Sequence, residues 1–163
     1  MNVFYFDECP TVSAQAQPDK LLVKMPLESA QMLSACHRIL DGDDYADENG
    51  LYKSTHKNHP CSVWLRESTE NYKWLYNHFV ALSNEYTERY GRTHLSFAKL
   101  HGVLKKLPDN LPVGEMTEVA QAMPEQYRNA DPVKAYREYV SNEKHYAKWD
   151  KIPSRKPSWW KTE

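Results

Sequence analysis

Apolar side chains recur three and four residues apart along most of this chain, which is the spacing of one face of an α-helix. The clearest segments span residues 19–40, 60–90, 93–106 and 131–149. In the first segment this spacing predicts a buried face made of Leu22, Met25, Leu33, Cys36 and Ile39 or Leu40. The fold is therefore expected to be mainly α.

Residues that commonly cap helices mark the ends of these segments. Asp19 is placed as an N-cap, and Gly42 and Gly91 are placed as helix stops. The pair Asp131-Pro132 combines a cap with a proline in the first turn, which predicts a helix start. Pro26 lies inside the first segment, so it predicts either a kink or a helix that begins later.

The segments between these helices are expected to be extended or irregular. Residues 2–6 form a short β-branched and aromatic run, which predicts either a strand or a buried extended arm. Residues 41–58 are polar and predict a loop, and residues 152–163 are too rich in proline for a helix. The chain is thus expected to be a single compact helical domain over residues 1–163, with an extended N-terminal segment and a basic tail rich in proline and tryptophan.

Length and composition agree with one domain. Apolar residues make up 40% of the 163 positions, which is enough for a sizeable core. No apolar run reaches the roughly 20 residues that span a bilayer, and the N-terminus lacks the basic-then-apolar order of a secretory signal. We therefore expect a cytoplasmic protein without a membrane partner.

Charge, cysteine usage and missing motifs exclude several classes of function. The net charge of −1 argues against a protein that coats nucleic acid by bulk attraction, although residues 144–161 hold six cations against the single acid Asp150. The three cysteines lie far apart and fit neither a disulfide framework nor a paired metal site. Because the common motifs for nucleotide binding, serine hydrolysis and zinc proteolysis are also absent, we expect no cofactor.

The helix expected over residues 19–40 carries four polar side chains along one edge, namely Lys20, Lys24, Glu28 and Gln31. Two amines and one carboxylate on one edge can perform acid–base or Schiff-base chemistry. Solvated Lys–Glu pairs on a packed helix give the same pattern without any chemistry. The residues alone leave both interpretations open.

Two histidines three residues apart precede the segment 60–90. The spacing of His56 and His59, with Cys61 close behind, resembles part of a zinc site, but no further ligand is marked by its spacing, so we expect no metal. One remaining interpretation is that His59 caps the next helix. Another is that His56, Asn58 and His59 hold a phosphate or a substrate.

Cations and aromatic residues elsewhere suggest contacts with nucleic acid. Arg66 and Arg92 are candidates for phosphate contacts, whereas most charges between them are expected on a solvated helix face. In the tail, Trp159 and Trp160 alternate with cations, and an aromatic ring beside a cation is a common way to hold an unstacked base. Trp149 is expected to pack on the core instead.

Several motifs resemble those of one known group of proteins over nearly the whole chain. They are Asp7-x-x-Pro10, Asp19-Lys20, Val23-Lys24-Met25, Glu28-x-Ala30-Gln31-Met32-Leu33, Thr55-His56-x-Asn58-His59-Pro60, Trp64-x-Arg66-x-Ser68, Asn71-Tyr72-x-Trp74-Leu75, Glu85-Tyr86-Thr87-x-Arg89-Tyr90-Gly91-Arg92, Gln121-Ala122-Met123-Pro124 and Asp131-Pro132-Val133-x-Ala135-Tyr136-Arg137. On these motifs the chain resembles the pyrimidine-dimer DNA glycosylases, the endonuclease V type of phages and bacteria. The aromatic, basic ending at residues 156–161 adds to the resemblance.

The resemblance implies a helical repair enzyme whose terminal α-amine attacks C1′ of a damaged nucleotide, releases the base and cleaves the strand by β-elimination through an imine. Glu28 would be the acid–base residue. Asn2 is bulkier than the residue that such enzymes expose after loss of the initiator, so the nucleophile here would be the Met1 amine or, failing that, Lys20 or Lys24. The resemblance also implies DNA as the partner and, for a phage-encoded protein, the host cytoplasm as the location. The residues expected to contact DNA are His56, Asn58, His59, Arg66, Arg92, Arg137, Lys156, Trp159 and Trp160.

The leading hypothesis is therefore a DNA glycosylase with AP-lyase activity on damaged or modified pyrimidines. A second hypothesis is a phage enzyme that modifies nucleotides or DNA bases with the Lys20, Lys24 and Glu28 edge together with His56 and His59. A third is a non-catalytic, helical nucleic-acid-binding module in which the basic tail performs recognition. The sequence leaves the oligomeric state open.

Overall fold

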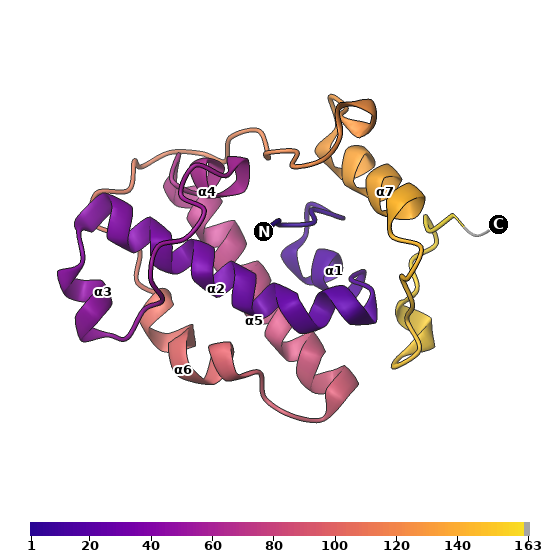
Figure 1. The fold of residues 1–163 in the computed structure, drawn as a ribbon, viewed down its shortest axis with the longest axis horizontal. Helices are drawn as coiled ribbons and strands as arrows, with labels where there is room; N and C mark the ends of the chain where they lie inside the picture. Colours follow the sequence, from indigo (N-terminus) through magenta and orange to yellow (C-terminus); the bar gives the residue numbers. More distant parts are fainter. Residues whose placement is uncertain (162–163) are drawn as a thin grey trace.

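The computed structural model describes residues 1–161, and this part of the chain is mainly α and contains no β-strand. None of its helices is both long and apolar enough to pass through a lipid bilayer. The expected fold class is confirmed (Figure 1). The elements are α1 (Pro10–Gln15), α2 (Asp19–Asp41), α3 (Asp44–Glu48), α4 (Pro60–Leu65), α5 (Thr69–Tyr90), α6 (Leu95–Leu104), η1 (Glu125–Tyr127), α7 (Pro132–Glu143) and η2 (Pro153–Arg155).

The two longest helices, α2 and α5, form the centre of the molecule. In Figure 1, α2 runs obliquely across the front and α5 lies behind it. Helix α5 also packs on α1, while α3, α4 and α6 pack on α2. The apolar face predicted for α2 is confirmed, because Leu22, Met25 and Leu33 are at most 2% exposed. Burial of such side chains is the main stabilising term of a fold of this kind.

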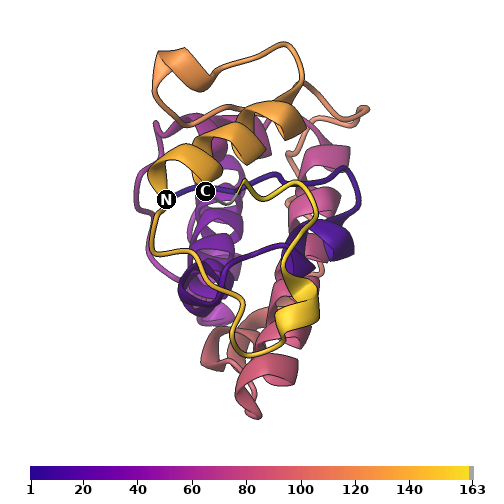
Figure 2. The same ribbon diagram turned by 90° about the vertical axis from the view of Figure 1, so that its right-hand side faces the viewer.

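The N-terminal segment, residues 2–6, is a buried extended arm and not a strand. Figure 2 shows it crossing the molecule between α7 and the lower helices. Its aromatic side chains pack on three different elements: Phe4 on Tyr136 of α7, Tyr5 on Trp74 of α5, and Phe6 on Trp159 of the tail. The segment therefore joins α7 and the tail to the helical core.

Polar side chains of α1 and its C-terminal flank take the place of a neighbouring strand. Ser13 Oγ accepts the Phe6 N–H and donates to the Phe4 carbonyl, and Gln17 Nε2 donates to the same carbonyl. These bonds satisfy buried backbone groups that would otherwise cost free energy. Helix α1 itself was not predicted, because its six residues show no clear apolar period.

The segment 60–90 was predicted as one helix, and that prediction was wrong. It contains two helices, α4 and α5, separated by residues 66–68. Ser68 has an extended backbone, and its Oγ accepts the Asn71 N–H as the N-cap of α5. The Ser68 hydroxyl thus starts a new helix inside a segment whose apolar spacing predicts a single one.

Four smaller predictions also need correction. Helix α2 begins at Asp19, so its N-cap is Pro18 and not Asp19. Pro26 lies inside the helix and does not delay its start. The polar segment 41–58 contains the short helix α3 around the buried Ala46. Helix α6 is shorter than the predicted 93–106 because His94 caps its start. Helix α7 starts at the predicted Asp131 cap but ends at Glu143, so the helical pattern expected up to residue 149 stops early.

Asp19 joins the C-terminal part of the chain to the core. One oxygen accepts a bond from Arg89 and the other accepts the Lys151 N–H. Arg89 and Arg155 both donate to one oxygen of Glu85, whose side chain is 4% exposed. Because such buried charges are costly unless paired, this network fixes residues 148–155 against α2 and α5.

Trp149 packs on the core as predicted, with 4% of its surface exposed and its Nε1 donating to the Ala16 carbonyl. The tail is non-helical except for the single turn η2. In Figure 2 it rises from η2 in the lower part of the molecule, passes in front of the α1 region and then turns across the face in view. The last two positions of the predicted tail, 162 and 163, lie outside the described residues.

His78 allows the contact between α1 and α5 to be tested. Its buried ring stacks on Trp74, and its Nδ1 donates to the Pro10 carbonyl at 3.0 Å. Burial lowers the pKa of His78 from 6.5 to about 4. Between these two values the unfolded chain binds the proton and the folded protein does not, so stability falls as the pH falls through this window. We expect this residue to remove roughly 2 kcal/mol of unfolding free energy between pH 7 and pH 5.

The variant His78→Asn keeps a side-chain N–H for the Pro10 carbonyl but has no titrating ring. Its unfolding free energy, measured by urea denaturation at several pH values, should fall less on acidification than that of the wild type. The same substitution at the exposed His145 serves as the control and should keep the wild-type slope. Equal slopes for all three proteins would contradict this role of His78.

Candidate active site

The first residue of the chain lies beside the glutamate of α2. The Met1 ammonium nitrogen is 3.2 Å from Oε1 of Glu28. The Glu28 side chain is 19% exposed and that of Met1 is 3% exposed, so the pair is sheltered but still open to solvent at the carboxylate. In Figure 1 the N-terminus accordingly lies in the middle of the molecule next to α2. An amine and a carboxylate at this distance can exchange a proton directly.

Asn2 fixes the direction in which the chain begins. Its Oδ1 accepts the N–H groups of Val3 and Phe4, and its Nδ2 donates to the Ala122 carbonyl. Phe4 has a left-handed backbone with φ of 47°, a conformation that bulky residues rarely adopt. The Asn2 side chain therefore holds a strained turn that directs the Met1 amine toward Glu28. The sequence shows the size of Asn2 but carries no signal of this positioning role.

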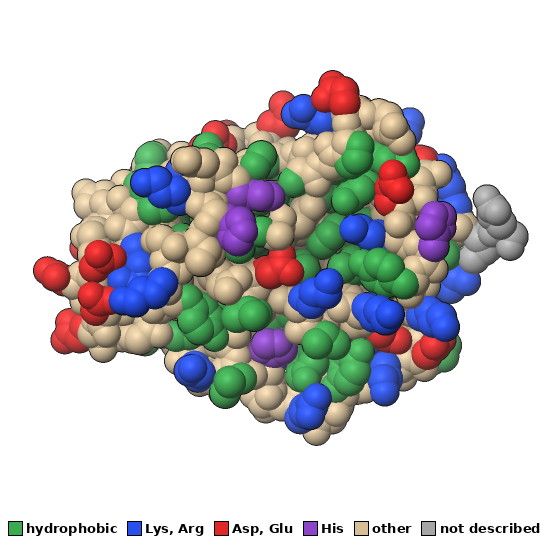
Figure 3. Space-filling model, viewed as in Figure 1, with side chains coloured by type: hydrophobic (Ala, Val, Ile, Leu, Met, Phe, Trp, Pro, Cys, Tyr) green, Lys and Arg blue, Asp and Glu red, His purple; other side chains and the backbone are tan. Residues whose placement is uncertain are grey.

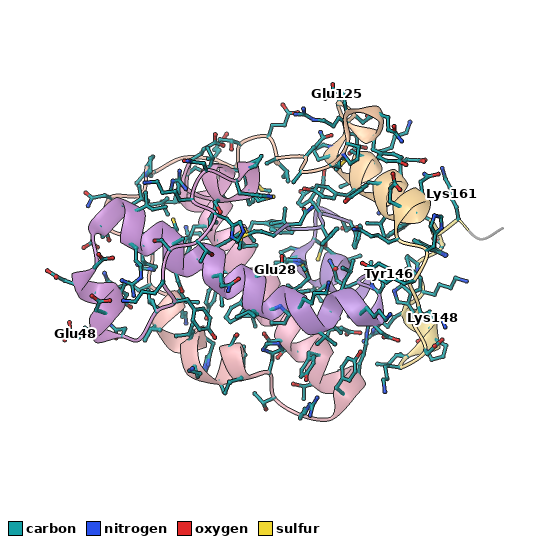
Figure 4. All side chains as sticks on the ribbon, viewed as in Figure 1. Glu28, Glu48, Glu125, Tyr146, Lys148 and Lys161 are labelled. Carbon is teal, nitrogen blue, oxygen red and sulfur yellow. The ribbon has the colours of Figure 1, made fainter. Side chains whose placement is uncertain are left out.

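The Met1–Glu28 pair lies in a cavity of about 390 Å³. Figure 4 shows Glu28 near the centre of the face in view, and in the same view Figure 3 shows an acidic patch at that point. Histidine side chains lie on one side of the patch, and Lys and Arg side chains lie on the other. The lining residues are Met1, Asn2, Phe4, Leu21, Lys24, Met25, Glu28, His59, Ala122, Tyr139, Lys144 and Tyr146.

Lysines and tyrosines form the wall of this cavity that faces the C-terminal part of the chain. Lys144 Nζ lies 5.3 Å from the ring centre of Tyr139, and Lys20 Nζ lies 5.5 Å from that of Tyr146. These cation–aromatic contacts order both lysines at the rim of the cavity. Tyr139, Lys144 and Tyr146 were not predicted as site residues, because they lie in the segment 131–149, whose spacing predicts one continuous helix. The cation-rich composition after residue 143 was the signal that pointed to this wall.

The predicted edge of α2 is confirmed in geometry. Lys20 and Lys24 are exposed, Glu28 and Gln31 are half-buried, and Lys24 lines the cavity together with Glu28. Lys20 reaches the rim through Tyr146. The cavity is therefore lined by three primary amines, those of Met1, Lys24 and Lys144, and by one carboxylate.

His59 joins this group from the opposite side. It caps α4, with its Nδ1 accepting the Cys61 N–H at 3.1 Å, so the prediction that it caps this helix is confirmed. Its pKa is lowered by burial and then by the positive charge of the Met1 amine and of His56, while Glu28 acts in the opposite direction. The ring is therefore neutral near pH 7.

The N-terminal part of the chain matches a known protein family. Residues 1–98 match the model of the family described as pyrimidine dimer DNA glycosylase. The chain belongs to this family. No curated protein and no solved structure matches it. The matched region of this glycosylase-family chain contains Met1, Glu28 and His59, whereas Lys144 and Tyr146 lie beyond it.

The other residues that we expected to contact DNA do not line the cavity of this glycosylase-family protein. His56 and Asn58 are exposed in the loop before α4, and His56 has a left-handed backbone with φ of 52°. The Arg66 guanidinium donates to the carbonyls of Lys57 and Ser62, so it holds this loop. Arg92 is exposed and donates to the Tyr86 hydroxyl.

Arg137, Lys156 and Trp159 meet in a second cavity of about 460 Å³ between the tail and the N-terminal segment. The Arg137 guanidinium lies 5.3 Å from the ring centre of Trp159 and donates to the Phe6 carbonyl. Trp160 instead packs edge-on against Trp149. The tail aromatics thus have structural contacts, while the half-buried Trp159 borders this basic hollow and the half-buried Trp160 borders another that Lys148 and Lys156 also line.

In the described part of the chain, the structure completes no zinc site around His56, His59 and Cys61. Across residues 1–161, no group of three or more His, Cys, Asp or Glu side chains is arranged to hold a metal ion. Cys61 is buried beside Asn2, and burial raises the pKa of its thiol to about 11. His59 and Cys61 therefore serve the geometry of the N-terminus and of α4.

Asn2 provides a test of how the amine is positioned. The variant Asn2→Ala leaves the buried Val3 and Phe4 N–H groups without their acceptor, so we expect a loss of roughly 2 kcal/mol in the free energy of unfolding. Asn58→Ala, at an exposed position, should change it by less than about 0.5 kcal/mol. Urea denaturation of both variants makes the comparison. Equal stability of the two variants would show that the Asn2 side chain does not hold this turn.

Proposed function

We propose that this protein is a DNA glycosylase with AP-lyase activity on damaged or modified pyrimidines, and that the Met1 amine is its nucleophile. Family membership supports a glycosylase that acts on DNA. The observation that carries the mechanism is the 3.2 Å contact between the Met1 nitrogen and Glu28 inside an open cavity. A nucleophile beside a proton acceptor is the arrangement that imine chemistry needs.

In the first step the neutral Met1 amine attacks C1′ of the damaged nucleotide. As a class, terminal α-amines have pKa values of about 8 and lysine side chains of about 10, so a terminal amine is more often neutral at pH 7. Glu28 accepts the proton that the ammonium must lose. The new N–C1′ bond forms as the C1′–N1 bond breaks, and the released base keeps the bonding electron pair and takes up a proton.

In the second step the sugar ring opens and the strand breaks. The C1′–O4′ bond breaks, O4′ takes a proton, and the amine nitrogen becomes doubly bonded to C1′. Glu28, as the carboxylate, then removes a proton from C2′. The electron pair of that C–H bond forms a C2′–C3′ double bond, and the 3′ phosphate leaves with the electrons of the C3′–O bond. Water hydrolyses the imine and restores the Met1 amine.

DNA fits the surroundings of this cavity despite the net charge of −1. Lys24 and Lys144 line the cavity and Lys20 lies at its rim, so phosphates on either side of a target nucleotide meet local positive charge. A base in a duplex reaches such a cavity only after extrusion from the stack. We propose that Arg137, Lys156 and Trp159 at the second cavity, and His56, Asn58, Arg66 and Arg92 on the surface, add further DNA contacts. A DNA substrate also agrees with the expected cytoplasmic location.

Borohydride trapping tests the nucleophile directly. With a duplex that contains one abasic site, reduction should give a covalent adduct, and mass mapping should place it on the Met1 peptide. One residue added before Met1 moves the amine by up to about 3.8 Å and should reduce trapping by roughly tenfold or more. Lys24→Gln keeps the Met1 amine in place, so the adduct should still map to the Met1 peptide, even where weaker phosphate binding slows trapping.

Other outcomes of these experiments would favour a different nucleophile or a different function. An adduct on Lys24 or Lys20 would keep the lyase and change the nucleophile. Activity on free nucleotides without affinity for duplex DNA would favour a nucleotide-modifying enzyme. Duplex binding without any adduct would favour a non-catalytic binding module.

Glu28 has a matched control in Glu48, which lies exposed on α3 at the far end of the view in Figure 4. Glu28→Gln keeps a hydrogen-bond acceptor for the amine but is a much weaker proton acceptor. We expect strand cleavage of an abasic duplex to slow by roughly 100-fold or more, because general acid–base groups contribute factors of this size. Glu48→Gln should cleave like the wild type. The two variants are compared by their single-turnover rates of strand cleavage. Equal rates for both would remove Glu28 from the mechanism.

A further inference from the structure

His59 reaches the cavity from the element opposite the lysines. It lies at the start of α4, is half-buried, and lines the cavity that holds the Met1 amine and Glu28. Figure 3 shows histidine side chains on one side of the central acidic patch and cationic side chains on the other. The cavity thus has lysines on one side and the imidazole of His59 on the other, and the Met1 amine lies between them.

The cap of α4 fixes which ring nitrogen of His59 carries the proton. Nδ1 accepts the Cys61 N–H, so the neutral ring must carry its hydrogen on Nε2. The charges that act on the ring are the Met1 amine, His56 and Glu28, and with burial their combined effect is to lower the pKa of His59. Near pH 7 the ring therefore presents one N–H donor and no net charge.

The layout of the cavity indicates what this donor meets. In a nucleotide, the base and the phosphates extend from the sugar in different directions. If the lysines hold the phosphates and the Met1 amine faces C1′, the base points toward His59. Breaking the C1′–N1 bond leaves negative charge on the pyrimidine ring and its O2 oxygen, and a fixed donor in a sheltered site stabilises such developing charge.

We propose that His59 is a further catalytic residue of the proposed glycosylase, and that its Nε2–H donates a hydrogen bond to O2 of the departing pyrimidine. This inference rests on the proposed function. The His59 ring keeps its Nε2 proton. The released base instead takes up the proton that Glu28 accepted from the Met1 ammonium. His59 thus acts in base release and has no part in β-elimination, where no base is present.

The structural role of His59 can be separated from this catalytic role. Asn is among the best N-cap residues, so His59→Asn keeps an acceptor for the Cys61 N–H while removing the ring that reaches the cavity. His59→Ala removes both. A melting temperature for His59→Asn within a few degrees of the wild type confirms that the variant is folded.

The experiment uses two duplexes, one with a single pyrimidine dimer and one with a preformed abasic site. For His59→Asn we expect single-turnover cleavage of the C1′–N1 bond at the dimer to slow by at least roughly tenfold, as for the loss of one donor to developing charge. Strand cleavage and borohydride trapping on the second should stay within about threefold of wild type. A folded His59→Asn that cleaves the C1′–N1 bond at the wild-type rate, or that loses both steps equally, would overturn the inference.

The wild-type protein distinguishes this failure from that of the proposed function. If wild type forms no adduct with the abasic duplex, the proposed function fails and the role of His59 fails with it. If wild type cleaves the abasic duplex but leaves the C1′–N1 bond of the dimer duplex intact, the lyase part stands and the assignment of His59 is overturned. Only a wild type active on both duplexes with a selective defect in His59→Asn supports the inference.

Discussion

The burial of the first six residues is the constraint on which the rest of this structure depends. An extended segment without a neighbouring strand must find hydrogen-bond partners elsewhere, and here they come from Asn2, Ser13 and Gln17. The same segment packs its aromatic rings on α5, α7 and the tail. Because hydrogen bonds hold the backbone of this segment and packing holds its rings, the Met1 amine has a defined position beside Glu28 and does not fray into solvent.

Local charge and total charge differ in this protein, and the local charge matters for the proposed substrate. Acidic side chains gather at the α3 end, where Asp43 and Asp47 pair with the buried Arg38. Cationic side chains are more frequent toward the end that holds the tail (Figure 3). A Debye length of about 8 Å at physiological ionic strength keeps the distant acids from cancelling the field of the lysines at the cavity. A net charge near zero is therefore compatible with binding DNA at one face.

The long helices were predictable from the sequence because their apolar period and end signals are local. Gly42 and Gly91 end α2 and α5 with positive φ, and Asp131 caps α7, as predicted. The errors arose where a short polar signal competed with an apolar pattern. Ser68 divides one predicted helix into two, and α3 forms in a segment whose polar composition predicts a loop, because Ala46 is buried against α2.

The candidate site likewise has a part that the sequence predicts and a part that it does not. Spacing along one helix was enough to place Lys20, Lys24 and Glu28 on a common edge, because neighbours on a helix are fixed by its geometry. The sequence by itself thus determined the helices and this edge. Only the tertiary structure decided that the Met1 amine, His59 and the wall of Tyr139, Lys144 and Tyr146 meet at that edge. Met1, His59 and this wall lie more than 50 residues apart from one another along the chain, and they converge only through the packing of buried side chains from several elements, which no local pattern encodes.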